Sequence, residues 1–86
     1  MEYISSRKFD KQFAKLSEKI KNQCVERIKI FIDNPFHETL NNHRLAGKYT
    51  GCRSINMTGD IRIIYEMVEN DTARFLIIGS HSELYK

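Results

Sequence analysis

The dipeptide Asn34-Pro35 divides this chain of 86 residues into two parts whose apolar side chains recur with different periods. Before it, apolar residues recur every three or four positions, the period of a helix that buries one face. After it, residues 61–68 alternate between two faces, the period of a half-buried strand. A residue before proline is forced away from helical dihedral angles, so the helical part ends here. The chain therefore joins a helical first part to a β-sheet second part.

The first part predicts one short strand and two helices. A strand over residues 2–5 precedes a helix with Ser5 or Ser6 as its N-cap, and Ser17 interrupts that helix and caps a second one. The apolar stripes of the two helices are Phe9, Phe13 and Leu16, then Ile20, Cys24, Ile28 and Phe31. We expect the two helices to pack antiparallel across a tight turn.

The second part predicts three consecutive strands over residues 52–57, 61–68 and 73–78, after a loop that spans residues 36–42. Compact turns at residues 58–60 and 69–71 make an antiparallel meander the simplest arrangement. The expected fold class is α+β: a single two-layer domain over residues 1–86 in the order β-α-α-β-β-β, with an antiparallel sheet covered on one face by the helix pair. The first strand is expected at an edge or beside a central strand.

Composition favours a soluble globular domain with one thin core, since 41% of residues are hydrophobic and 29% are charged. No apolar run approaches the roughly 20 residues of a membrane helix, and residues 1–9 lack the core of a signal peptide, so a cytoplasmic location without membrane contact is expected. Cys24 and Cys52 have no metal-site or redox spacing and are interpreted as small apolar residues. Net charge is +3 over residues 1–34, +2 over 35–65 and −2 over 66–86, which favours an anionic partner.

Two residues in the second part, His81 and Asp60, have both a functional and a structural interpretation. His81 follows the last strand after Gly79-Ser80, where its side chain stands either at the end of the sheet or in a solvent-exposed tail. Asp60 lies in a Thr-Gly-Asp turn, where aspartate often bonds to nearby backbone amides. No histidine has a metal-ligand spacing, so no metal or other cofactor is expected.

Arg62 lies within an otherwise apolar strand, so its guanidinium requires water or an anion. A phosphate would satisfy it, and so would the carboxylate of Glu66 or Asp60. Further positive charge comes from Arg44, Lys48 and Arg53, interleaved with Tyr49. Such a patch suits the backbone of single-stranded RNA.

The run HRLAGKYTGCRSINMTGDIRIIYE, together with GSHSELY after the next strand, resembles the RelE superfamily of bacterial toxins and most closely its YafQ-like branch. The likeness covers nearly the whole chain. It rests on H-x-L-x-G, an arginine-containing strand, D-x-x-x-x-Y, and a final G-x-H-x-x-x-aromatic, in that order.

The resemblance carries site residues over to positions that match. His43 opens the motif, Asp60 follows the strand turn, His81 is the histidine near the end, and Tyr85 is the terminal aromatic. Arg62 stands where many RelE relatives have arginine, although the YafQ branch often has an apolar residue there. Asn56 stands where YafQ-like sequences can carry an additional histidine, and its amide is expected to hydrogen-bond RNA.

The resemblance implies a ribosome-dependent endoribonuclease that enters the ribosomal A site, cuts mRNA and is held inactive by a cognate antitoxin protein. His81 is the expected general acid and His43 the expected general base, with Asp60 either orienting a histidine or serving as the base itself. Arg62, with Arg53, would stabilise charge on the phosphate, and Tyr85 would stack on or orient a base. No metal is required for this chemistry.

Two other functions are compatible with the same fold. One is a toxin like the ParE relatives, which poison DNA gyrase, although those relatives generally lack the set His43, Asp60 and His81. The other is a non-catalytic RNA-binding module, which Asn56 in place of a histidine would suit.

Overall fold

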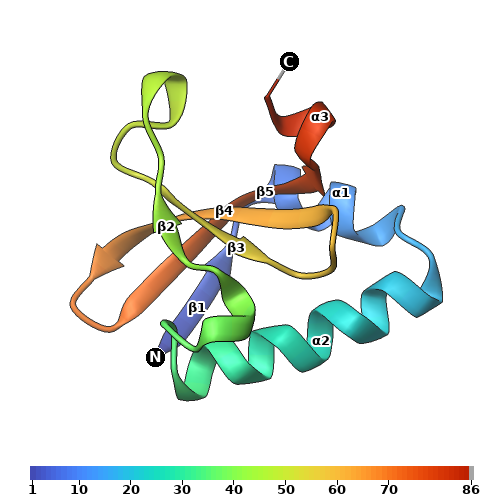
Figure 1. Cartoon of the computed structure of the whole chain (residues 1–86), viewed down its shortest axis with the longest axis horizontal. Coiled ribbons are helices and arrows are strands. Elements are labelled where there is room, and N and C mark those ends of the chain that lie inside the picture. Colours follow the sequence, from blue (N-terminus) through green and yellow to red (C-terminus); the bar gives the residue numbers. More distant parts are fainter. Residues whose placement is uncertain (86) are drawn as a thin grey trace.

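The computed structural model describes residues 1–85 (Figure 1). Its strands are β1 (Glu2–Ser5), β2 (His43–Arg44), β3 (Arg53–Asn56), β4 (Ile61–Glu69) and β5 (Thr72–Ser80). Its α-helices are α1 (Arg7–Ala14), α2 (Glu18–Asp33) and α3 (His81–Leu84), and two 3-10 turns are η1 (Glu38–Leu40) and η2 (Gly47–Tyr49). The predicted α+β class is confirmed. None of the helices within residues 1–85 has the length and apolar character needed to cross a membrane.

The five strands form one sheet in the order β1-β5-β4-β3-β2. The strands from β2 to β5 pair antiparallel, as the meander predicts. β1 pairs in parallel with β5, so the sheet is mixed and the first strand lies at an edge, which is one of its two predicted positions.

Serine side chains cap the N-termini of α1 and α2. The Ser6 hydroxyl accepts a hydrogen bond from the Phe9 amide at 3.0 Å, and the Ser17 hydroxyl accepts one from the Ile20 amide at 3.2 Å. Each bond satisfies an amide that has no partner in the first helical turn. The predicted cap at Ser17 is confirmed, and Ser6 is the first helix's cap.

The core lies between the two long helices and one face of the sheet, where aromatic rings meet. Phe31 of α2 packs edge-on against Tyr65 of β4 and Phe75 of β5, with ring centroids 5.0 and 5.6 Å apart. Phe9 of α1 reaches the same Phe75 ring at 5.5 Å. Side chains from α1, α2 and the sheet form one buried cluster, so the expectation that the helices cover one face is confirmed.

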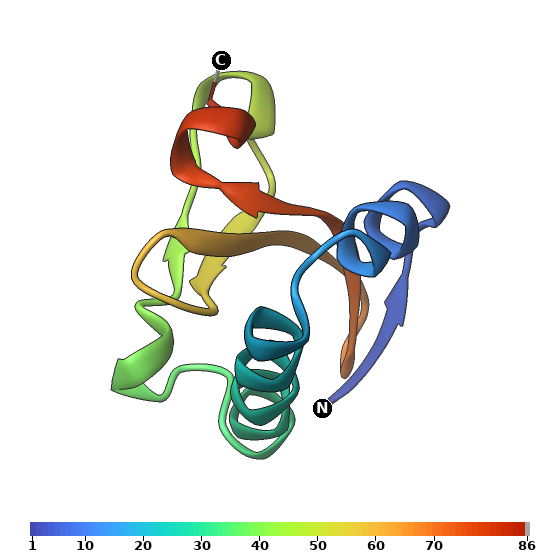
Figure 2. The same ribbon diagram turned by 90° about the vertical axis from the view of Figure 1, so that its right-hand side faces the viewer.

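The opposite face of the sheet is partly covered by α3 and by the connection that carries η2 (Figure 2). Leu84 of α3 and Ile64 of β4 are buried outside the main core. A Cβ at Gly79 would lie 3.4 Å from atoms of Glu83 and Leu84, so the absence of a side chain at this position lets α3 pack closely. The sequence pattern predicts neither α3 nor β2, because a four-residue helix and a two-residue strand are too short to show a period.

Candidate functional site

Asp60 and His81 meet at one end of the sheet, where β4 begins and β5 ends. Ile61 pairs with Ser80 across these strands, which places the residues just outside the pair side by side. The His81 amide donates to the Asp60 carbonyl oxygen at 3.2 Å, with the Asp60 Oδ1 atom 3.4 Å away. Asp60 also keeps its turn role, since its amide donates to Thr58 Oγ1 at 3.2 Å. The turn therefore presents Asp60 to the segment that carries His81.

A reciprocal cap makes the tail helical and orients His81. The Ser80 hydroxyl accepts from the Glu83 amide at 3.2 Å, and the Ser80 amide donates to the Glu83 carboxylate at 2.8 Å. One helical turn then brings the His81 and Tyr85 rings together, with centroids 4.7 Å apart. His81 is exposed, so it stands at the end of the sheet with its side chain open to solvent.

Arg62 and Asn56 lie on the sheet beside this corner. They are directly opposite each other on β3 and β4, and Arg62 Nη1 donates to Asn56 Oδ1. Arg62 also pairs with Gly79, two residues before His81. Because directly opposite residues project to one face, Arg62 and Asn56 share the face that α3 packs against.

The Arg62 guanidinium has no carboxylate partner within residues 1–85. Neither Glu66 nor Asp60, the two partners that the sequence suggests, forms an ion pair with it. Its Nε is buried and makes no hydrogen bond to any of the described residues, which is costly for a polar atom. No carboxylate of these residues therefore balances the positive charge of the guanidinium, and an anion would complete its set of partners.

Arg53 lies on the other face of the sheet. It pairs with the core residue Tyr65, its Nε donates to Asn42 Oδ1 at 2.6 Å, and its guanidinium lies 5.2 Å from the Phe36 ring centroid. Asn42 in turn donates to the Tyr65 hydroxyl at 2.8 Å. The exposed Arg44 pairs with Arg53 and projects to the same side. The structure thus separates these two arginines from Arg62.

His43 lies on the edge strand β2. It pairs with Ser54, so it projects to the same face as Asn56 and Arg62, and its side chain is exposed. Its Nδ1 contacts the Asn41 carbonyl oxygen at 2.8 Å. Three strand spacings separate β2 from β5, about 14 Å, so His43 does not touch the corner formed by Asp60 and His81.

Lys48 and Tyr49 approach the site from the connection between β2 and β3. Tyr49 donates from its hydroxyl to the Leu84 carbonyl oxygen at 2.7 Å, and its ring lies edge-on to Tyr85 at 5.7 Å. Lys48 Nζ lies 5.1 Å from the Tyr49 ring centroid. In the sequence, Tyr49 stands out only as an aromatic residue among basic ones. Its contact with α3 joins residues far apart in the chain, so no local sequence pattern predicts it.

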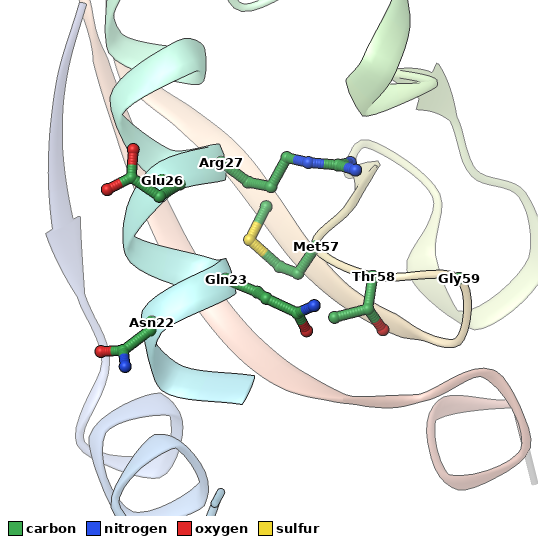
Figure 3. Close-up of a pocket in the computed structure, with 7 residues that line it drawn as sticks. All are labelled: Asn22, Gln23, Glu26, Arg27, Met57, Thr58 and Gly59. Atoms are coloured by element: carbon green, nitrogen blue, oxygen red, sulfur yellow. The ribbon is translucent and has the colours of Figure 1, made fainter. Parts of the chain in front are cut away.

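A cleft of about 430 Å³ lies between α2 and the turn from β3 to β4 (Figure 3). Gln23 and Arg27 extend from α2 toward Met57 and Thr58 (Figure 3). Arg27 Nη1 donates to the Thr39 carbonyl oxygen at 2.9 Å and to the Asn56 carbonyl oxygen at 3.4 Å. Arg27 therefore supports the end of β3 that carries Asn56. A second cleft, of about 500 Å³, is lined by residues that include Arg44, Cys52 and Arg53.

Within residues 1–85, no three histidine, cysteine, aspartate or glutamate side chains lie together as a metal-binding group. The two cysteines are free, and Cys24 is fully buried. Burial raises the pKa of Cys24 from 9.0 to about 11. Burial, and then the nearby Glu66 carboxylate, also raises the pKa of Cys52.

Thiol labelling at neutral pH is expected to modify Cys52 slowly and Cys24 only as fast as the chain unfolds, because the thiolate is the reactive form. Colorimetric titration with a disulfide reagent measures both rates, and the denatured chain is the control in which both thiols react. Two rapidly labelled thiols in the native protein would contradict this burial.

Because folding raises the pKa of Cys24, the free energy of unfolding is expected to fall as pH rises from 9.0 toward about 11.

The fold is that of the RelE/YafQ toxins. YafQ from E. coli strain BL21(DE3) has a TM-score of 0.81 at 21% identity, covering 99% of this chain and 98% of that one. A YoeB/ParE toxin from Agrobacterium tumefaciens has a TM-score of 0.76 at 14% identity, covering 94% and 99%. The E. coli DinJ-YafQ toxin-antitoxin complex has a matching chain with a TM-score of 0.78 at 21% identity, covering 99% and 97%. No curated protein matches the chain.

Residues 1–86 match the family described as bacterial toxin of type II toxin-antitoxin system, YafQ. The chain therefore belongs to the YafQ family of toxins, as the motifs around His43, Asp60 and His81 predict.

Proposed function

We propose that this toxin is a ribosome-dependent endoribonuclease that cleaves mRNA by acid and base catalysis without a metal ion. The observation that carries the proposal is the corner where Asp60 and His81 meet. Tyr85 lies beside His81, and the nearby Arg62 guanidinium has no carboxylate partner within residues 1–85. The corner lies at the open end of the sheet, and His81 and Asp60 are exposed, which suits a polymeric substrate.

Each group in the corner has a part in RNA cleavage. A base withdraws the proton of the 2′-hydroxyl, which attacks the adjacent phosphorus; the bond to the 5′-oxygen breaks, and an acid protonates that oxygen. His81 is the general acid, because an imidazole can gain and lose a proton near neutral pH. The products carry a 2′,3′-cyclic phosphate, or the 3′-phosphate formed from it by hydrolysis, and a 5′-hydroxyl.

The geometry favours Asp60 over His43 as the general base. Asp60 lies beside His81, whereas His43 is three strand spacings away, about 14 Å. His43 projects to the same face and would contact a neighbouring nucleotide. Arg62 would stabilise charge on the attacked phosphate, with Asn56 beside it, and Tyr85 would stack on a base.

Lys48 adds positive charge near α3, because it lies beside Tyr49 in the connection that the Tyr49 hydroxyl joins to α3. Arg44 and Arg53 lie on the other face, so we assign them no contact with the scissile phosphate.

The proposed partners are the ribosomal A site with its mRNA, and a cognate antitoxin protein, all in the cytoplasm. Structural similarity to the YafQ chain of the E. coli DinJ-YafQ toxin-antitoxin complex supports the antitoxin partner.

Cleavage of a translated message by the purified protein tests the proposed function. Primer extension should show cuts phased with codons when ribosomes translate the message, and few cuts on naked RNA. Inhibition of gyrase supercoiling without RNA cuts would instead support the ParE-like alternative. RNA binding with neither effect would support the non-catalytic module.

A further inference from the structure

The short helix α3 is the last helix within residues 1–85, and it carries His81 at its first position. A helix of four residues leaves its last carbonyl groups without partners inside the helix, so other contacts must hold it in place. The Tyr49 hydroxyl supplies such a contact by donating to the Leu84 carbonyl oxygen at 2.7 Å. Tyr49 therefore ties α3 to a connection 35 residues earlier in the chain.

The same contact continues through three rings. The Tyr49 ring stands at 88° to the Tyr85 ring with centroids 5.7 Å apart, and the Tyr85 ring lies 4.7 Å from the His81 imidazole. The Tyr85 amide also donates to the His81 carbonyl oxygen at 3.1 Å. Tyr85 is thus held between Tyr49 and His81 by its ring and by its backbone.

We propose that Tyr49 is a positioning residue that fastens the connection between β2 and β3 to α3 and thereby fixes Tyr85 and His81 in the site. The inference rests on the proposed function for its consequence in catalysis, but its structural part concerns the free protein. Tyr49 acts through Tyr85 and Leu84 and needs no contact with the reacting atoms.

Two substitutions separate the hydroxyl from the ring. Tyr49→Phe removes only the bond to Leu84, and Tyr49→Leu removes the ring contact as well. Tyr3→Phe is the matched control, because Tyr3 lies on β1, is 42% exposed and has no hydrogen bond to its hydroxyl within residues 1–85.

NMR of the free protein is the first readout. Tyr49→Phe should speed hydrogen exchange of the Tyr85 amide by about 2- to 10-fold, the effect of losing one hydrogen bond, and leave core amides of β4 unchanged. Tyr49→Leu should in addition shift the His81 ring signals, because Tyr85 loses its edge-on neighbour. Unchanged Tyr85 exchange and unchanged His81 signals in Tyr49→Leu would overturn the proposal, and the unchanged core amides show that the variant folds.

Kinetics on translated messages are the second readout. Tyr49→Phe should lower kcat by about 2- to 10-fold with little change in KM, and should lower it no further when His81 is already alanine. Equal losses in both backgrounds would mean that Tyr49 acts independently of His81. If the wild-type protein cuts no RNA, the proposed function fails while the NMR result still decides the positioning role.

Discussion

Replacing His81 with alanine is expected to lower the single-turnover rate of RNA cleavage by about 10²- to 10⁴-fold. Without the imidazole, the leaving 5′-oxygen loses the acid that the proposed mechanism assigns to it. Folding should be unaffected, because the His81 side chain is exposed and only its backbone bonds to Asp60. Rapid mixing of excess toxin with ribosomes stalled on a labelled message measures the rate.

His37→Asn provides the matched control for loss of an imidazole. His37 caps η1 by accepting from the Thr39 amide at 3.2 Å, and asparagine is also a good N-cap. This variant should cut at the wild-type rate. Wild-type cutting by His81→Ala would remove His81 from the mechanism and leave the general acid unassigned.

Arg62→Gln is expected to lower the cleavage rate by about 10²-fold, the effect of removing one preorganised donor to a developing negative charge. Glutamine can still bond Asn56 but carries no charge. Affinity for a non-cleavable single-stranded RNA should also depend less on salt, with the log-log slope smaller by about 0.7 if one phosphate contact is lost. Filter binding at several salt concentrations measures the slope.

Arg74→Gln is the matched control for loss of an arginine charge, because Arg74 is an exposed residue of the neighbouring strand β5. It should change neither the rate nor the slope. If Arg62→Gln behaves like Arg74→Gln, Arg62 has a structural role only.

Asn56→Asp tests whether the free charge of Arg62 is the important property. Because Asn56 Oδ1 already accepts from Arg62 Nη1, a carboxylate at this position would form an ion pair with the guanidinium. The rate should fall toward that of Arg62→Gln although Arg62 is retained. A rate equal to that of the wild type would show that the RNA phosphate competes successfully with the carboxylate.

Local patterns in the sequence determine the elements that carry this site. The capping serines Ser6 and Ser17, the helical stripe through Cys24 and Phe31, and the alternation around Ile63 and Tyr65 each involve residues a few positions apart. The bonds or faces that they specify are formed within one element, so these predictions are confirmed. Order along the chain also predicts that Asp60 precedes one strand of a hairpin and that His81 follows the other.

Only the tertiary structure decides how these elements face one another. Alternation along β3 and β4 does not say which set of side chains faces the core, and the strand register places Arg62 with Asn56 but Arg53 with Tyr65. Packing likewise sets β1 in parallel against β5, leaves His43 on the far edge, and brings Tyr49 to Leu84. The sequence alone thus indicated the residues of the corner, and tertiary packing decided which of them meet, because contacts between residues of different elements leave no periodic pattern in the chain.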